Sequence, residues 1–165
     1  MKDEFVFLSP EWVHEATRVI QGTRSTDENF GKLTQSFSLS LIYVVTELPQ
    51  CLRELHGGPQ LVVLVQLEKG SVRRLWLGTD VPKEKHDFMV SSSYDLAKQI
   101  FCGEGNPATA FIDRKFKVEP MSRVYQRPRF TAKAIVTGNA MLKVARRVPT
   151  VFPPNGVPKG AASAL

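Results

Sequence analysis

The sequence has few cysteines and histidines, and its last quarter has no acidic residues. Two of its 165 residues are cysteines and three are histidines. The cysteines, Cys51 and Cys102, lie far apart and form no CxxC motif, which excludes a zinc finger of the usual spacing. We expect two reduced thiols, as in a cytoplasmic protein, and a disulfide between them is the alternative.

The three histidines form no catalytic or metal-binding motif. His14, His56 and His86 each lack a second ligand at helical spacing, and no paired carboxylates stand on an apolar background. Cys102 precedes Gly103 at an expected helix end, where the helix dipole disfavours a thiolate. The sequence therefore predicts no enzyme, no metal and no cofactor, and a site assembled from distant residues is the alternative.

Long hydrophobic runs are also missing. No apolar run approaches the roughly 20 residues that cross a membrane, and acidic residues near the start argue against a secretory signal. We expect a cytoplasmic protein with one domain over residues 1–148. Residues 149–165, rich in Pro, Gly, Ala and Ser, are predicted to form a flexible tail.

The charges divide the chain at Glu119. Residues 1–119 carry 14 Lys and Arg and 16 acidic residues, whereas residues 120–165 carry 8 Lys and Arg and no acidic residue. Such a block can face phosphate on a lipid, a nucleic acid or a nucleotide-bearing ligand, and a solvated surface is the alternative. Few aromatic residues accompany the cations, so nucleic-acid binding is not expected. The cations expected at an anionic membrane or headgroup are Arg123, Arg127, Arg129, Lys143, Arg146 and Arg147.

Helix start signals and apolar periodicity predict an α+β fold. Ser9 and Pro10 are typical of a helix start, and Gly22 of its end. Residues 23–35 are polar and predict an exposed connection. Alternating or continuous apolar residues predict strands over 37–48, 60–70, 71–78 and 86–93.

The second half continues with short elements. Ser92 is the expected N-cap of a helix over 94–101, and Asn106-Pro107 begins another short helix. Phe116 and Val118 predict a fifth strand. Residues 121–131 then read as a basic loop, and Thr131 is the expected cap of an amphipathic helix over 132–148.

The stretch SSSYDLAKQIFCGEGNPATAFIDRKFKVEP, residues 91–120, resembles the signature region of the sterol carrier protein type-2 family. That family has a Gly-x-x-(Asp/Asn)-Pro turn after a helix, then an Ala-Phe pair and a Lys-x-Lys-(Val/Ile) strand. The matching residues here are Gly103, Asn106, Pro107, Ala110, Phe111, Lys115, Lys117 and Val118. LSPEWV, residues 8–13, resembles the start of prokaryotic stand-alone members. Arg114 stands where the family usually has Gly, and its Cβ is expected to alter the strand's approach or narrow the adjacent space.

The resemblance implies a five-stranded, mostly antiparallel sheet with helices on one face, enclosing an apolar tunnel for fatty acyl chains, acyl-CoA, sterols or phospholipids. The implied function is non-catalytic lipid binding or transfer. An accessory module that delivers or shields a hydrophobic substrate for a partner enzyme is the alternative, as is an enzyme with an unrecognised site. The sequence does not indicate the oligomeric state. The residues expected to line the pocket, if they do not simply fill a dry core, are Phe88, Val90, Leu96, Ile100, Phe111, Ile135, Met141 and Leu142.

Overall fold

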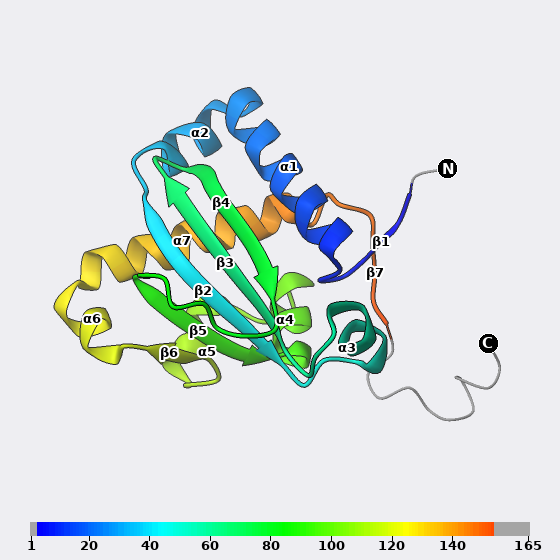
Figure 1. Cartoon of the computed structure of the whole chain (residues 1–165). Coiled ribbons are helices and arrows are strands. Elements are labelled where there is room, and N and C mark those ends of the chain that lie inside the picture. The colour runs from blue at the N-terminus through cyan, green and yellow to red at the C-terminus, as the bar shows by residue number, and fades with distance from the viewer. Residues whose placement is uncertain (1–2, 154–165) are drawn as a thin grey trace.

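The structure is a computed structural model that describes residues 3–153, and it is an α+β fold built on a five-stranded sheet (Figure 1). The strand order is β4-β3-β2-β5-β6. Its strands are β2 (Leu39–Thr46), β3 (Leu61–Glu68), β4 (Ser71–Gly78), β5 (Phe88–Ser93) and β6 (Lys117–Glu119). The β2–β5 pair is parallel and the other three pairs are antiparallel. The predicted fold class, a mostly antiparallel sheet with helices, is confirmed.

Helices cover one face of this sheet, and the longest, α7, runs behind the strands beside α1 in Figure 1. The helices are α1 (Pro10–Thr26), α2 (Glu28–Gln35), α3 (Gln50–His56), α4 (Tyr94–Phe101), α5 (Pro107–Ile112), α6 (Met121–Gln126) and α7 (Pro128–Ala145). The predicted starts of α1 and α5 are confirmed, because Ser9 accepts a hydrogen bond from the Trp12 amide and Asn106 from the Ala108 amide. Within residues 3–153, no helix has the length and apolar character needed to cross a membrane.

Four local predictions were wrong. The first helix passes through Gly22 to Thr26, and Asp27 then caps α2, so residues 23–35 are helical instead of a polar connection. Residues 121–131 form α6 and the first turn of α7 instead of a basic loop. Thr131 lies inside α7 and donates to the Arg127 carbonyl at 3.1 Å. The N-cap of α4 is Ser93, whose hydroxyl accepts from the Leu96 amide, and not Ser92.

The ordered structure extends beyond residue 148, where the flexible tail was expected to begin. Strand β7 (Thr150–Val151) pairs in parallel with β1 (Phe5–Val6) near the N-terminus. Phe152 packs against Phe7, with ring centroids 5.3 Å apart. The rest of the predicted tail, residues 154–165, lies outside the described residues.

The connection from β4 to β5 covers the other face of the sheet. Both strands run in the same direction and two strands separate them, so residues 79–87 cross back over this outer face (Figure 1). Beneath the crossing, Ile42, Val62 and Leu64 are 0% exposed. Trp76 packs on them and lies across Gly78, where an added Cβ would sit 2.3 Å from the indole ring. The middle of the outer face is therefore closed to solvent.

Candidate functional site: an apolar cavity

A cavity of about 450 Å³ lies between the inner face of the sheet and the helices. The sheet contributes alternate residues of β2, β3 and β5, because successive strand residues point to opposite faces. Helices α1, α4, α5 and α7 contribute their inner faces, and Val124 of α6 closes one end. The volume falls in the range of small-molecule sites, about 300–1,000 Å³.

The inner face of the sheet is buried unevenly where it borders the cavity. Val45, Leu61 and Phe88 of this face are buried. Leu41, Tyr43 and Val65 of the same face line the cavity and keep part of their surface accessible. The helices therefore leave space above this part of the sheet.

Seven of the eight residues expected to line a pocket surround the cavity. They are Phe88, Val90, Ile100, Phe111, Ile135, Met141 and Leu142. Leu96 is half-buried on α4 but does not belong to the lining. Trp12, Val13 and Ile20 of α1 also line the cavity and were not among the expected residues, although their helical spacing places them on one face. Arg114 is exposed and does not line the cavity.

Two hydroxyl groups stand out in the apolar lining. The Tyr43 hydroxyl lies 2.7 Å from the Ser92 hydroxyl, and burial raises the pKa of Tyr43 to about 12. The Thr137 hydroxyl is buried and has no hydrogen-bond partner within the described chain. Other helical threonines, such as Thr17 and Thr23, donate to the carbonyl four residues earlier. Thr137 therefore differs from its counterparts, and its hydroxyl carries an unmet desolvation cost.

A glycine in the middle of α7 leaves one part of the cavity wall open, because it has no side chain. Gly138 lines the cavity, lies at the centre of the inner face of α7 and is itself exposed. A Cβ at this position would meet no other atom within 4 Å. Glycine inside a helix costs about 0.5–1 kcal/mol relative to alanine. Gly138 therefore makes α7 less stable by about this amount, and it leaves this part of the cavity wall without a side chain.

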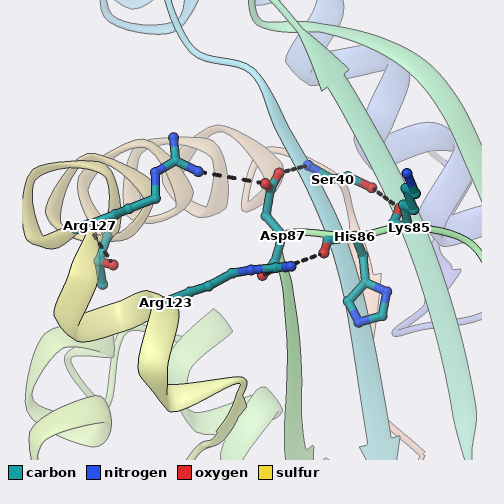
Figure 2. Close-up of polar contacts among 7 residues, drawn as sticks. Ser40, Lys85, His86, Asp87, Arg123 and Arg127 are labelled. Atoms are coloured by element: carbon teal, nitrogen blue, oxygen red, sulfur yellow. Dashed lines mark hydrogen bonds and ion pairs between the residues drawn. The ribbon is translucent and has the colours of Figure 1, made fainter.

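Two of the arginines expected to contact a membrane, Arg123 and Arg127, instead bind the segment before β5. Figure 2 shows Arg123 and Arg127 reaching the segment before β5. Arg123 donates to the carbonyls of His86 and Asp87 at 2.6 and 2.9 Å, and Arg127 lies 3.9 Å from an Asp87 oxygen. The other Asp87 oxygen accepts from the Ser40 amide at 2.8 Å. This network fixes α6 and the start of α7 against the β2–β5 pair.

The cations near the end of α7 are also partly engaged. Arg146 donates to the carbonyls of Phe101 and Ile100 at the end of α4, and Arg147 donates to the Thr23 hydroxyl at 3.3 Å. Arg129 and Lys143 are exposed. They stand 14 positions apart on one helix, or about 21 Å along its axis. The six cations therefore form two groups at opposite ends of α7, not one continuous surface.

Within residues 3–153, the histidines and cysteines lie outside the cavity lining. His56 contacts the Leu8 carbonyl at 2.8 Å and His86 the Glu84 carbonyl at 2.9 Å, and neither lines the cavity. Cys51 and Cys102 are both free and exposed, and partial burial raises the pKa of the Cys51 thiol. Over residues 3–153, no three His, Cys, Asp or Glu side chains are grouped to hold a metal ion.

Comparison with known proteins adds evidence on the fold. No protein-family model matches the sequence, and no curated protein matches it significantly. A conserved hypothetical protein of Thermus thermophilus, described as a candidate sterol carrier protein, aligns over 94% of this chain and 98% of its own, with a TM-score of 0.62 and 16% identity. A crystal structure of sterol carrier protein 2 aligns over 81% of this chain and 95% of its own, with a TM-score of 0.57 and 17% identity. The chain therefore has the fold of sterol carrier protein 2, as the sequence resemblance predicted.

Proposed function

We propose that the protein binds a long apolar chain in this cavity and carries it through water without transforming it. The observation that carries the proposal is the cavity of about 450 Å³ between the sheet and the helices, which apolar side chains such as Leu41 and Val65 line. The fold that the chain shares with sterol carrier protein 2 supports the same reading. A lipid carrier of this kind fits a cytoplasmic protein. The free cysteines favour the same compartment, because the cytoplasm keeps thiols reduced.

The energetics of such binding are favourable without any specific polar contact. Burying an acyl chain of about sixteen carbons gains roughly 0.8 kcal/mol per CH₂, or about 12 kcal/mol in total. Association and ordering cost about 4–15 kcal/mol. At the low end of this cost the net gain is about 8 kcal/mol, which corresponds to a micromolar dissociation constant. Selectivity for chain length should be loose, because one methylene changes the affinity little.

Blocking the cavity tests the proposal. The neutral dye Nile red reports occupancy by its fluorescence, and unlabelled dodecan-1-ol or dodecanoate should displace it. Gly138→Phe places a ring at the open part of the wall and should weaken dye binding at least about tenfold, because the ring occupies ligand space. Gly22→Phe is the matched control, since Gly22 is also a helical glycine with no atom near its Cβ position, and it lies outside the cavity lining.

A second test distinguishes residues that line the cavity from residues of the filled core. Phe111→Ala and Met141→Ala should weaken ligand binding while reducing stability modestly, because both side chains border empty space. Leu52→Ala removes a fully buried side chain and should cost about 2–5 kcal/mol of unfolding free energy. The proposal fails if no acyl chain, alcohol or sterol displaces the dye. It also fails if neither native mass spectrometry nor dye binding detects a ligand in the cavity.

Peripheral contact with anionic membranes is a separate proposal with a weak expected effect. Four of the six predicted cations bind groups of their own chain, and Arg129 and Lys143 stand at opposite ends of α7. A cation near an anionic surface contributes about 1 kcal/mol. Co-sedimentation with phosphatidylserine vesicles should therefore be slight and lost in high salt, and equal binding to phosphatidylcholine vesicles would refute an electrostatic contact.

A further inference from the structure

The apolar cavity cannot hold a charged headgroup. None of the lining residues within 3–153 is charged, and their polar groups are the indole N–H of Trp12, the amide of Asn139 and hydroxyls such as those of Tyr43 and Thr137. Burying an ionised carboxylate in such surroundings costs many kcal/mol unless it is paired and hydrogen-bonded. The headgroup of an anionic amphiphile whose chain occupied the cavity would have to leave it at a polar place on its rim.

Such a place adjoins the cavity between the α4–α5 turn and α7. An open recess of about 350 Å³ is bounded by residues 103–107 on one side and by Asn139, Lys143 and Arg146 on the other. Pro107 and Asn139 belong to both the recess and the cavity lining. The recess and the cavity are therefore adjacent, and a single extended molecule that occupied both would have its chain in the cavity and its head in the recess.

The two cations of the recess are arranged differently. Arg146 is fixed, because it donates through Nε and Nη2 to the last carbonyls of α4. Gly103, whose φ of +78° favours glycine, lies beside this guanidinium just beyond the end of α4. Lys143 lies three residues earlier on the same helix and is exposed, so its ammonium can move to meet a ligand.

We propose that this recess, with Lys143 and Arg146, binds the carboxylate or another anionic headgroup of an amphiphile whose chain lies in the cavity. The inference rests on the proposed function and names its ligand class. Glu104 also borders the recess, so the two cations exceed the acidic residues there by one. A fixed guanidinium and a mobile ammonium favour an anion over a neutral alcohol of the same chain length.

The test compares two competitors that differ in the headgroup. Dodecanoate and dodecan-1-ol each displace Nile red from the whole protein at low salt. Lys143→Gln should weaken dodecanoate about threefold to fivefold, the size of one exposed ion pair, and should change dodecan-1-ol less than about twofold. Lys143→Glu should enlarge the effect on dodecanoate, and 1 M salt should remove most of it, because the Debye length falls to about 3 Å.

Lys85→Gln provides the matched control, because Lys85 is exposed on the crossing that covers the opposite face of the sheet (Figures 1 and 2). It should alter neither competitor. If Lys143→Gln leaves dodecanoate unchanged, or weakens both competitors equally, the headgroup site is wrong while chain binding stands. If neither competitor displaces the dye from the unmodified protein, the proposed function itself fails.

Discussion

The indole Nε1 of Trp12 donates a hydrogen bond to the Thr150 hydroxyl at 2.9 Å and so joins α1 to β7 across 138 positions of sequence. The ring of Trp12 also packs edge-on against Phe7, with centroids 4.8 Å apart. Phe7 in turn contacts Phe152 beyond β7. The two ends of the described chain therefore belong to one aromatic cluster beside the cavity.

Weakening this link should destabilise the whole fold. Thr150→Val removes the acceptor and leaves a part-buried indole N–H unpaired, which should lower the free energy of unfolding by about 1 kcal/mol. Thr26→Val, at an exposed helical threonine, should change the free energy of unfolding little.

Truncation tests the contribution of β7 as a whole. In urea unfolding, a chain ending at Val148 should be clearly less stable than one ending at Pro153, and equal midpoints would show that β7 does not contribute.

Replacing Thr137 should stabilise the protein. Its buried hydroxyl has no partner within residues 3–153, and valine has nearly the same shape, so Thr137→Val should raise the free energy of unfolding by about 1 kcal/mol. Thr34 is equally buried, but its hydroxyl donates to the Phe30 carbonyl at 3.0 Å and accepts from Arg24 at 2.9 Å. Thr34→Val should therefore be destabilising. Changes of the same sign in thermal unfolding of the two ligand-free variants would contradict this assignment.

Arg114 occupies a backbone conformation suited to glycine. Its φ is +58°, in the left-handed region that costs a non-glycine residue about 1–2 kcal/mol. Because glycine also increases the entropy of the unfolded chain, Arg114→Gly should stabilise the protein by a net of about 0.5–1 kcal/mol. Arg114→Ala keeps the Cβ and serves as the control. Equal stability of the Gly and Ala variants would mean that the turn carries no strain.

Alkaline conditions should destabilise the fold through its buried phenols. The pKa of Tyr43 is raised by burial to about 12, and desolvation also raises that of Tyr94. A phenol whose pKa is higher in the folded state than in the unfolded state, where it is about 10, favours folding below pH 10. That contribution is lost as the pH rises from 10 through 12. Tyr43→Phe should make stability fall less steeply in this window, as measured by urea unfolding at successive pH values.

The sequence predicted the elements whose signals are local. Ser9-Pro10 and Asn106-Pro107 marked helix starts correctly, and the continuous apolar run of β3 marked a central strand. Gly103, which was expected to end α4, has a φ of +78° just beyond the helix C-cap. These features depend on backbone preferences that neighbouring residues alone determine.

The missed elements depend on contacts that are distant in sequence. Helix α2 has few apolar residues and is held by Arg24, which donates to the Thr34 hydroxyl, and by burial of Phe30. Helix α6 begins after Pro120 without a side-chain cap, and Arg123 anchors it to the segment before β5. Strand β7 forms only because β1 lies beside it. None of these partners could be identified from local sequence.

The candidate site was predicted only in part, because the cavity also depends on contacts that are distant in sequence. The family resemblance and the apolar stripe of the amphipathic helix α7 indicated which residues point inward, and seven of the eight named line the cavity. A stripe alone does not reveal whether inward residues meet one another or an empty space. That distinction depends on the separation of sheet and helices, which is a property of the whole fold.

The cavity between the sheet and the helices implies an unusual response to hydrostatic pressure. Pressure favours the state of smaller volume, and unfolding eliminates internal voids such as the cavity of about 450 Å³. The empty protein should therefore unfold at lower pressure than a filled-core protein of its size. A ligand that occupies the cavity should raise the unfolding pressure beyond what its binding free energy at ambient pressure explains. Pressure titration thus measures occupancy of the interior before the ligand has been identified.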